Sequence, residues 1–181
     1  MTPLRAAHVS RTVALMLDIA LAPLLLFAMV WVQRRQATIL REGIALTHAQ
    51  RDLARVLGVT AVERVRVMSA SVVPMPMPDF ARRVAESAGW ISPHIVGMTL
   101  GHGIVLHDDC CGDQQLLAHE LTHVHQYERL GGIAPFLRHY LRECVWLGYP
   151  LGPLEMEASA AEIRGSTAGQ DVIPYVPSAV P

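Results

Sequence analysis

The sequence predicts an α+β fold, a small domain with a short sheet and several helices, preceded by a transmembrane helix. Three observations predict it: one long apolar run near the start, short or alternating apolar segments between residues 62 and 107, and helical periodicity after residue 113. A chain of 181 residues has room for one domain. We expect an N-terminal tail at 1–12, the transmembrane helix at 13–32, the domain at 33–164 and a flexible C-terminal tail at 165–181.

The apolar run at 13–32 contains a single charged residue, Asp18. Twenty residues rising 1.5 Å each cover the roughly 30 Å hydrocarbon core of a bilayer. Trp31 lies at the end of the run, and Arg34 and Arg35 follow it, as is typical of a membrane boundary. These features favour a single-pass helix in contact with membrane lipid over a cleaved signal peptide, a buried core helix or a segment lying on the membrane. The excess of arginine after the run predicts a cytoplasmic body.

The elements beyond this run follow from hydrophobic periodicity and from breaks at glycine and proline. We expect an amphipathic helix from Gln36 to Leu57, a half-buried strand from Val62 to Met68, an extended proline-rich loop at 74–78, a short helix at 79–88, a hairpin or a bulged strand at 98–107, and helices at 113–130, 135–147 and 154–164.

Charge and cysteine content exclude two classes of function. The net charge is −1, from 15 basic and 16 acidic residues, so no basic field exists to bind nucleic acid. Cys110 and Cys111 are adjacent and the only other cysteine is Cys144, which is not the spacing of a disulfide framework or of a metal cluster. We therefore expect reduced thiols and no partnership with nucleic acid.

The expected helix at 113–130 contains the pattern H-E-x-x-H, formed by His119, Glu120 and His123. Residues four apart on a helix differ by about 40° around its axis, so both imidazoles can bind one metal ion. Glu120 lies on nearly the same side, where it can contact a metal-bound water. The pattern therefore predicts two metal ligands and a neighbouring base.

A catalytic zinc site needs a third protein ligand and an open position. Glu155 is favoured because it follows a glycine- and proline-rich hinge that lets the chain return toward His123, but the residues themselves leave Glu157 open. The other candidates are Glu162, His102, His107, His125 and His139.

The segment H-E-L-T-H-V-H-Q at 119–126 resembles the active-site helix of gluzincin-type zinc metallopeptidases, especially bacterial zincin-like domains that carry H-E-L-T-H-V-x-Q. The segment at 153–158 resembles the helix that holds the third ligand in that class, which implies Glu155. Ser159 stands where many relatives have an aspartate that binds a ligand histidine, so Glu157 or Glu162 would have to substitute. The resemblance spans roughly residues 99–164.

This resemblance implies a membrane-anchored metallopeptidase with a zincin-like fold, Zn²⁺ as cofactor, and a peptide or protein as substrate. His119, His123 and Glu155 would hold the metal, and Glu120 would act as general base on a zinc-activated water. Candidates for the group that stabilises the oxyanion are His139, Tyr140, Arg142 and Tyr149. The alternative is a noncatalytic zinc-binding or membrane scaffold module that keeps the same fold. The sequence does not indicate an oligomeric state.

Overall fold

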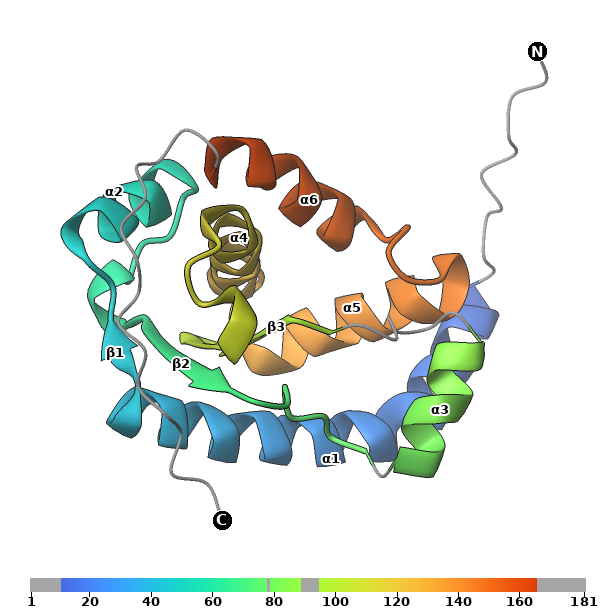
Figure 1. The fold of residues 1–181 in the computed structure, drawn as a ribbon. Helices are drawn as coiled ribbons and strands as arrows, with labels where there is room; N and C mark the ends of the chain where they lie inside the picture. The colour runs from blue at the N-terminus through green and yellow to red at the C-terminus, as the bar shows by residue number, and fades with distance from the viewer. Residues whose placement is uncertain (1–10, 78, 89–94, 166–181) are drawn as a thin grey trace.

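The computed structural model describes residues 11–77, 79–88 and 95–165, apart from the side chains of residues 11–21, 79 and 165 (Figure 1). These residues form six α-helices and a four-stranded mixed sheet, so the expected α+β class is confirmed. The elements are α1 (Arg11–Glu42), β1 (Ile44–Ala45), α2 (His48–Val56), the 3-10 turn η1 (Val62–Arg64), β2 (Arg66–Ala70), α3 (Asp79–Ser87), β3 (Gly97–Leu100), β4 (Gly103–His107), the 3-10 turn η2 (Asp108–Cys110), α4 (Gln114–Leu130), α5 (Ile133–Leu147) and α6 (Pro153–Gly165).

The sheet has the strand order β1-β2-β4-β3, which leaves β1 and β3 at its edges. The β2 and β4 strands are parallel, with Val67 opposite Ile104, whereas β1 and β3 run antiparallel to their neighbours. Gly101 lies in the turn between β3 and β4 with a φ of 68°, a left-handed conformation that favours glycine. Of the two forms expected at 98–107, the structure has the hairpin and not the bulged strand.

Helices cover both faces of the sheet, with α4 on one side and α1 on the other (Figure 1). Side chains of β4 alternate between two cores: Ile104 and Leu106 pack with Leu117 and Leu121 of α4, while Val105 packs with Ile39 of α1. This double burial explains why β4 is apolar at successive positions. The α6 helix packs along α4, which brings the two expected ligand helices together (Figure 1).

The expected helix from Gln36 to Leu57 is wrong, because two helices and a strand occupy this segment. A Cβ on Gly43 would lie 2.6 Å from the carbonyl oxygen of Ile39, so the chain turns there where only glycine fits. Two residues of β1 then pair with β2, and Thr47 starts α2 with a capping box that includes Gln50. An amphipathic helix would place Ile39 and Leu46 on one face, but they lie on opposite faces of the sheet, Ile39 in the α1 core and Leu46 in the α4 core.

The other expected elements are found with small shifts of their ends. The strand predicted from residue 62 begins at Arg66, because Val62–Arg64 form a 3-10 turn, and Val65 and Val67 are buried as expected. Residues 74–77 are in neither helix nor strand, and helices form at Asp79–Ser87, Gln114–Leu130, Ile133–Leu147 and Pro153–Gly165.

The predicted membrane segment at 13–32 lies within α1. Ala28 and Val32 are buried, so this end of the segment packs against the protein body. Within the part of the chain that is described, no helix combines the length and the apolar character needed to cross a bilayer. The side chains of residues 13–21 lie outside that part, so the membrane helix stays a prediction. Residues 1–10 and 166–181 of the two expected tails also lie outside the described residues.

Candidate metal centre

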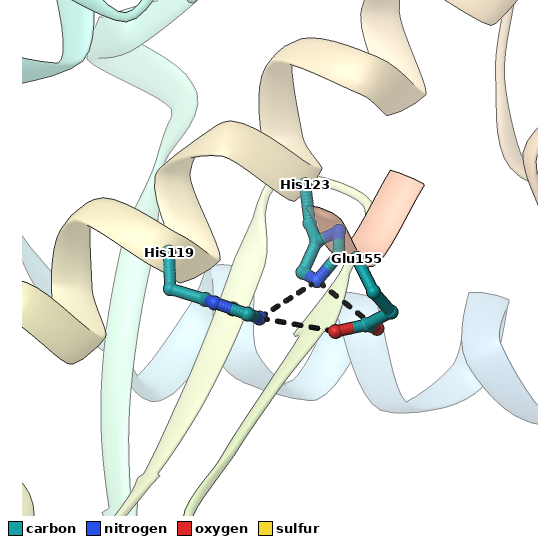
Figure 2. A group of neighbouring side chains, drawn as sticks. All are labelled: His119, His123 and Glu155. Carbon is teal, nitrogen blue, oxygen red and sulfur yellow. Dashed lines mark hydrogen bonds and ion pairs between the residues drawn. The ribbon is translucent and has the colours of Figure 1, made fainter. Parts of the chain in front are cut away.

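The α4 helix presents His119 and His123 toward α6. It begins after Asp113, whose side chain accepts hydrogen bonds from two backbone N–H groups of the first turn, and it ends at Gly131 in a left-handed conformation. Between these caps the two histidines are one turn apart, and their Nε2 atoms approach to 3.1 Å (Figure 2). The local sequence therefore fixes the spacing of the pair.

Glu155 enters from the first turn of α6 and completes a group of three. Its Oε2 lies 3.4 Å from His119 Nε2 and its Oε1 lies 3.5 Å from His123 Nε2 (Figure 2). The start of α6 is held in place by Glu143 of α5, whose carboxylate accepts a hydrogen bond of 3.0 Å from the backbone N–H of Leu154. The candidate ligand atoms of the three residues all lie within 4.8 Å of one another. Figure 2 shows the carboxylate of Glu155 facing both rings.

Glu157, the alternative that the sequence left open, turns away from this group. Its carboxylate accepts hydrogen bonds from the Arg129 guanidinium at 2.8 and 2.9 Å and from Gln126 Nε2 at 3.0 Å. These contacts join α6 to the end of α4. The structure therefore brings Glu155, and not Glu157, to the two histidines.

The outer nitrogen of each ring contacts an oxygen acceptor. His119 Nδ1 lies 2.9 Å from Oε1 of Glu162, and His123 Nδ1 lies 2.8 Å from Oε1 of Gln126. Since both partners accept, each Nδ1 donates a hydrogen bond, and the two Nε2 atoms face each other and the Glu155 carboxylate. Glu155 Oε2 lies near His119 but makes no hydrogen bond, although it is buried. Such converging acceptors require a positive charge among them.

The electrostatics of His119 agree with that requirement. Burial lowers the pKa of its imidazole, but the close contact with the Glu155 carboxylate and the charges of Glu120 and Glu155 more than offset burial and raise the pKa to about 9. The group thus favours a cation, and two imidazoles with one carboxylate are a donor set that zinc uses in catalytic sites. The residues present therefore fit a divalent metal ion, whose identity the geometry does not show.

Glu120 lies beside this group and is held by the edge strand β3. Thr99 Oγ1 lies 2.7 Å from Glu120 Oε2 and 2.9 Å from the Glu120 carbonyl oxygen. A Cβ on Gly97 would overlap with Glu120 Oε1, so this strand approaches the carboxylate closely only because residue 97 is glycine. Glu120 is 4% exposed, and burial raises the pKa of its carboxyl despite the opposing effects of His123 and His119.

Two tyrosines lie beside Glu155: Tyr140 in α5, and Tyr149 just after the end of that helix. Tyr140 donates a hydrogen bond of 2.7 Å to Glu155 Oε1, and Phe136 stacks on Tyr140 with ring centroids 5.8 Å apart. Tyr149 lies next to Tyr140, Glu155 and Cys144. Burial and the charges of nearby carboxylates, that of Glu155 foremost, raise the pKa of Tyr149 to about 12, so its hydroxyl keeps its proton at neutral pH.

The remaining sequence candidates lie elsewhere. His102 contacts Glu128, His107 contacts Asp109, His125 contacts the carbonyl of Gly58, and His139 is exposed. Cys110, Cys111 and Cys144 form no disulfide in the structure, and the candidate metal-binding group found among the described residues contains none of them.

Sequence reasoning missed Gln126 and Thr99. Gln126 is fully buried and donates to the carbonyl of Leu154 at 2.9 Å as well as to Glu157, which leaves its Oε1 as the acceptor for His123. Its position three residues after His123, on the same helix face, is the signal that could have identified it. Thr99 has no comparable local signal, because its contact with Glu120 spans two elements.

Residues 46–131, just under half of the chain, match the family model of the eCIS core domain. The matched stretch runs from the residues before α2 to the end of α4 and contains His119, Glu120 and His123, whereas Glu155 lies beyond it. No curated protein and no solved structure matches the chain.

Proposed function

We propose that this chain, with its match to the eCIS core domain, is a zinc-dependent metallopeptidase that hydrolyses peptide bonds. One observation carries the proposal: His119, His123 and Glu155 converge from two helices, with a buried base, Glu120, beside them. The resemblance of the α4 sequence to gluzincin peptidases supports the same assignment. The substrate would be a peptide or protein.

The metal would be held by His119, His123 and Glu155. A zinc ion in such a site supplies Lewis acidity, which activates water and polarises a carbonyl group. Glu120 is the chain's own acceptor for a proton from water, and its raised pKa suits a base that must also return the proton to the leaving amine. The Thr99 hydroxyl keeps the Glu120 carboxylate in place, and Tyr140 does the same for Glu155.

Among the oxyanion candidates, Tyr149 is better placed than Tyr140 or His139. The hydroxyl of Tyr140 is engaged by Glu155, and His139 is exposed on α5. Tyr149 lies beside Glu155 and keeps its proton, so its hydroxyl is a hydrogen-bond donor for a substrate oxygen in this proposal.

The substitution Glu120→Gln tests the proposal. It keeps the shape of the side chain but removes the base, so we expect one zinc per chain, as in the unmodified protein, and loss of cleavage by at least about 100-fold. Cleavage is measured by mass spectrometry on a peptide library of mixed sequence. The double variant His119→Ala, His123→Ala should lose both metal and cleavage. Equal cleavage by Glu120→Gln and the unmodified protein would falsify the assignment.

A noncatalytic zinc-binding module is the second candidate, and the enclosure of Glu120 favours it. This carboxylate is 4% exposed, and Thr99 occupies one of its oxygens. One zinc per chain without cleavage of any library peptide would favour this module over the peptidase. Less than about one zinc per chain would instead favour a membrane scaffold without a metal site.

Membrane anchoring belongs to the same proposal. Residues 22–27 of α1 are all apolar, and all but Leu25 are exposed, with Leu26 63% and Phe27 56% accessible. A helix that is apolar on all sides is expected in lipid or in a protein core. Arg35 lies over the Trp31 ring at 5.8 Å, a pairing suited to the headgroup region. In this proposal the body lies on the cytoplasmic side.

A further inference from the structure

We infer that Glu162 is a positioning residue of the metal centre, which fixes the His119 ring and strengthens metal binding through it. The inference rests on the metal site of the proposed function, but it needs no catalysis. Glu162 is not one of the three candidate ligands, and its carboxylate contacts the outer nitrogen of a ligand histidine. Such partners orient the ring and raise the basicity of the nitrogen that binds the metal.

The placement of Glu162 follows from the period of α6. Seven residues correspond to nearly two helical turns, so Glu155 and Glu162 lie on the same face of the helix. Glu155 reaches His119 Nε2, and Glu162 reaches Nδ1 of the same ring at 2.9 Å. One face of α6 therefore contacts both nitrogens of His119. Ser159, between the two glutamates, is exposed, and its hydroxyl could not supply the negative charge that Glu162 brings.

The two candidate ligand histidines have different partners, so the effect of Glu162 on His119 differs from that of Gln126 on His123. His119 contacts a carboxylate, whereas His123 contacts the neutral amide of Gln126. Both oxygens fix a tautomer, but only the carboxylate adds a negative charge beside its ring. The Glu162 side chain is also 42% exposed, while Gln126 is fully buried. Glu162 can therefore be changed with little effect on the core.

The first test measures zinc affinity by competition with a chromophoric chelator. We expect Glu162→Ala to weaken binding by about 10- to 100-fold, the usual effect of removing such a partner. Glu162→Gln should lose less than about tenfold, because the amide oxygen still accepts the hydrogen bond while the charge is lost. The control is Glu63→Gln, which removes one negative charge from a side chain that is 65% exposed and pairs with arginines of α2, and which should bind zinc normally.

The second test follows the His119 ring without metal, by ¹⁵N NMR at a pH where the chemical shifts of its two nitrogens show a neutral ring. We expect a proton on Nδ1 in the unmodified protein and in Glu162→Gln, and a mixture of tautomers in Glu162→Ala. The inference is overturned if Glu162→Ala keeps both the single tautomer and the zinc affinity of Glu63→Gln. If the unmodified protein binds no zinc, the proposed function fails, but the tautomer change still decides the role of Glu162. Thermal melting checks that the variants are folded.

Discussion

The Thr99 hydroxyl lies 2.7 Å from Oε2 of Glu120, so the edge strand β3 holds the carboxylate that follows the first ligand histidine. This contact predicts that Thr99→Val separates metal binding from catalysis. A hydrogen bond to a charged group contributes about 1.5–3 kcal/mol, so we expect cleavage to fall at least about tenfold while zinc content stays the same. Zinc analysis and peptide-library cleavage measure the two effects.

Thr99→Ser is the matched control, because it keeps the hydroxyl and removes only a methyl group. We expect it to cleave nearly as well as the unmodified protein. If Thr99→Val also cleaves normally, the hydroxyl has no role in positioning Glu120.

The fold and the site differ in how far local sequence could predict them. The limits of α4 and the spacing of its histidines were predictable because the Asp113 cap, the Gly131 end and the four-residue interval are local features. The helix predicted from Gln36 was wrong because periodicity does not show which face of the sheet a residue covers, and Ile39 and Leu46 cover opposite faces.

The partners of the histidines were harder to predict, because most depend on how α6 packs against α4. Glu155 and Glu157 both follow the same hinge. Which of them faces the histidines depends only on which side of α6 packs against α4. The choice of Glu155 came from resemblance, and the structure agrees with it. The contact between Glu162 and His119 spans 43 residues, so no local pattern contains it.

The contacts of Gln126 predict that its replacement lowers both the stability of the fold and the affinity for metal. It is fully buried and connects His123 to the backbone of Leu154, so Gln126→Leu leaves buried polar groups without partners. Each unsatisfied group costs about 1–3 kcal/mol, so we expect the free energy of unfolding without metal to fall by at least this amount. Urea denaturation measures the loss, and chelator competition should show weaker zinc binding because the His123 ring is no longer fixed.

The control for Gln126→Leu is Gln33→Leu, at an exposed position of α1. A surface substitution of this kind should change the free energy of unfolding by less than about 0.5 kcal/mol. Equal stability of the two variants would contradict the role assigned to Gln126.

The contacts of Glu128 predict that the free energy of unfolding falls in acid, independently of the metal centre. Burial raises the pKa of its carboxyl, but the hydrogen bonds from the N–H and hydroxyl of Thr60 and the N–H of Ala61, with the contact to His102, lower it overall below 4.5. A carboxyl with a depressed folded-state pKa stabilises the fold above its unfolded-state pKa, and this contribution is lost as the pH falls through the folded-state value.

The comparison of the unmodified protein with Glu128→Gln checks the direction of this pH dependence. Without metal at pH 7, we expect the variant to be less stable by about 1.5–3 kcal/mol, the range for hydrogen bonds to a charged group. The difference should shrink as the pH falls below the unfolded-state pKa and through the lowered folded-state pKa of Glu128, because its carboxyl then takes up a proton and loses its charge. A difference that stays constant between pH 7 and pH 3 would show that the charge of Glu128 contributes nothing.

The exposed apolar turn of α1 predicts binding to lipid vesicles. We expect the full chain to float with vesicles of phosphatidylcholine mixed with phosphatidylserine, because Leu26 and Phe27 are more than half exposed and arginines follow them. A charged residue placed in the apolar part of a bilayer costs about 2.5–3.5 kcal/mol, so the double variant Leu26→Asp, Phe27→Asp should remain in the soluble fraction. Val56→Asp, at an exposed apolar position of α2, is the control and should float normally. If the unmodified chain stays soluble, or if the double variant floats equally well, this part of α1 does not enter lipid.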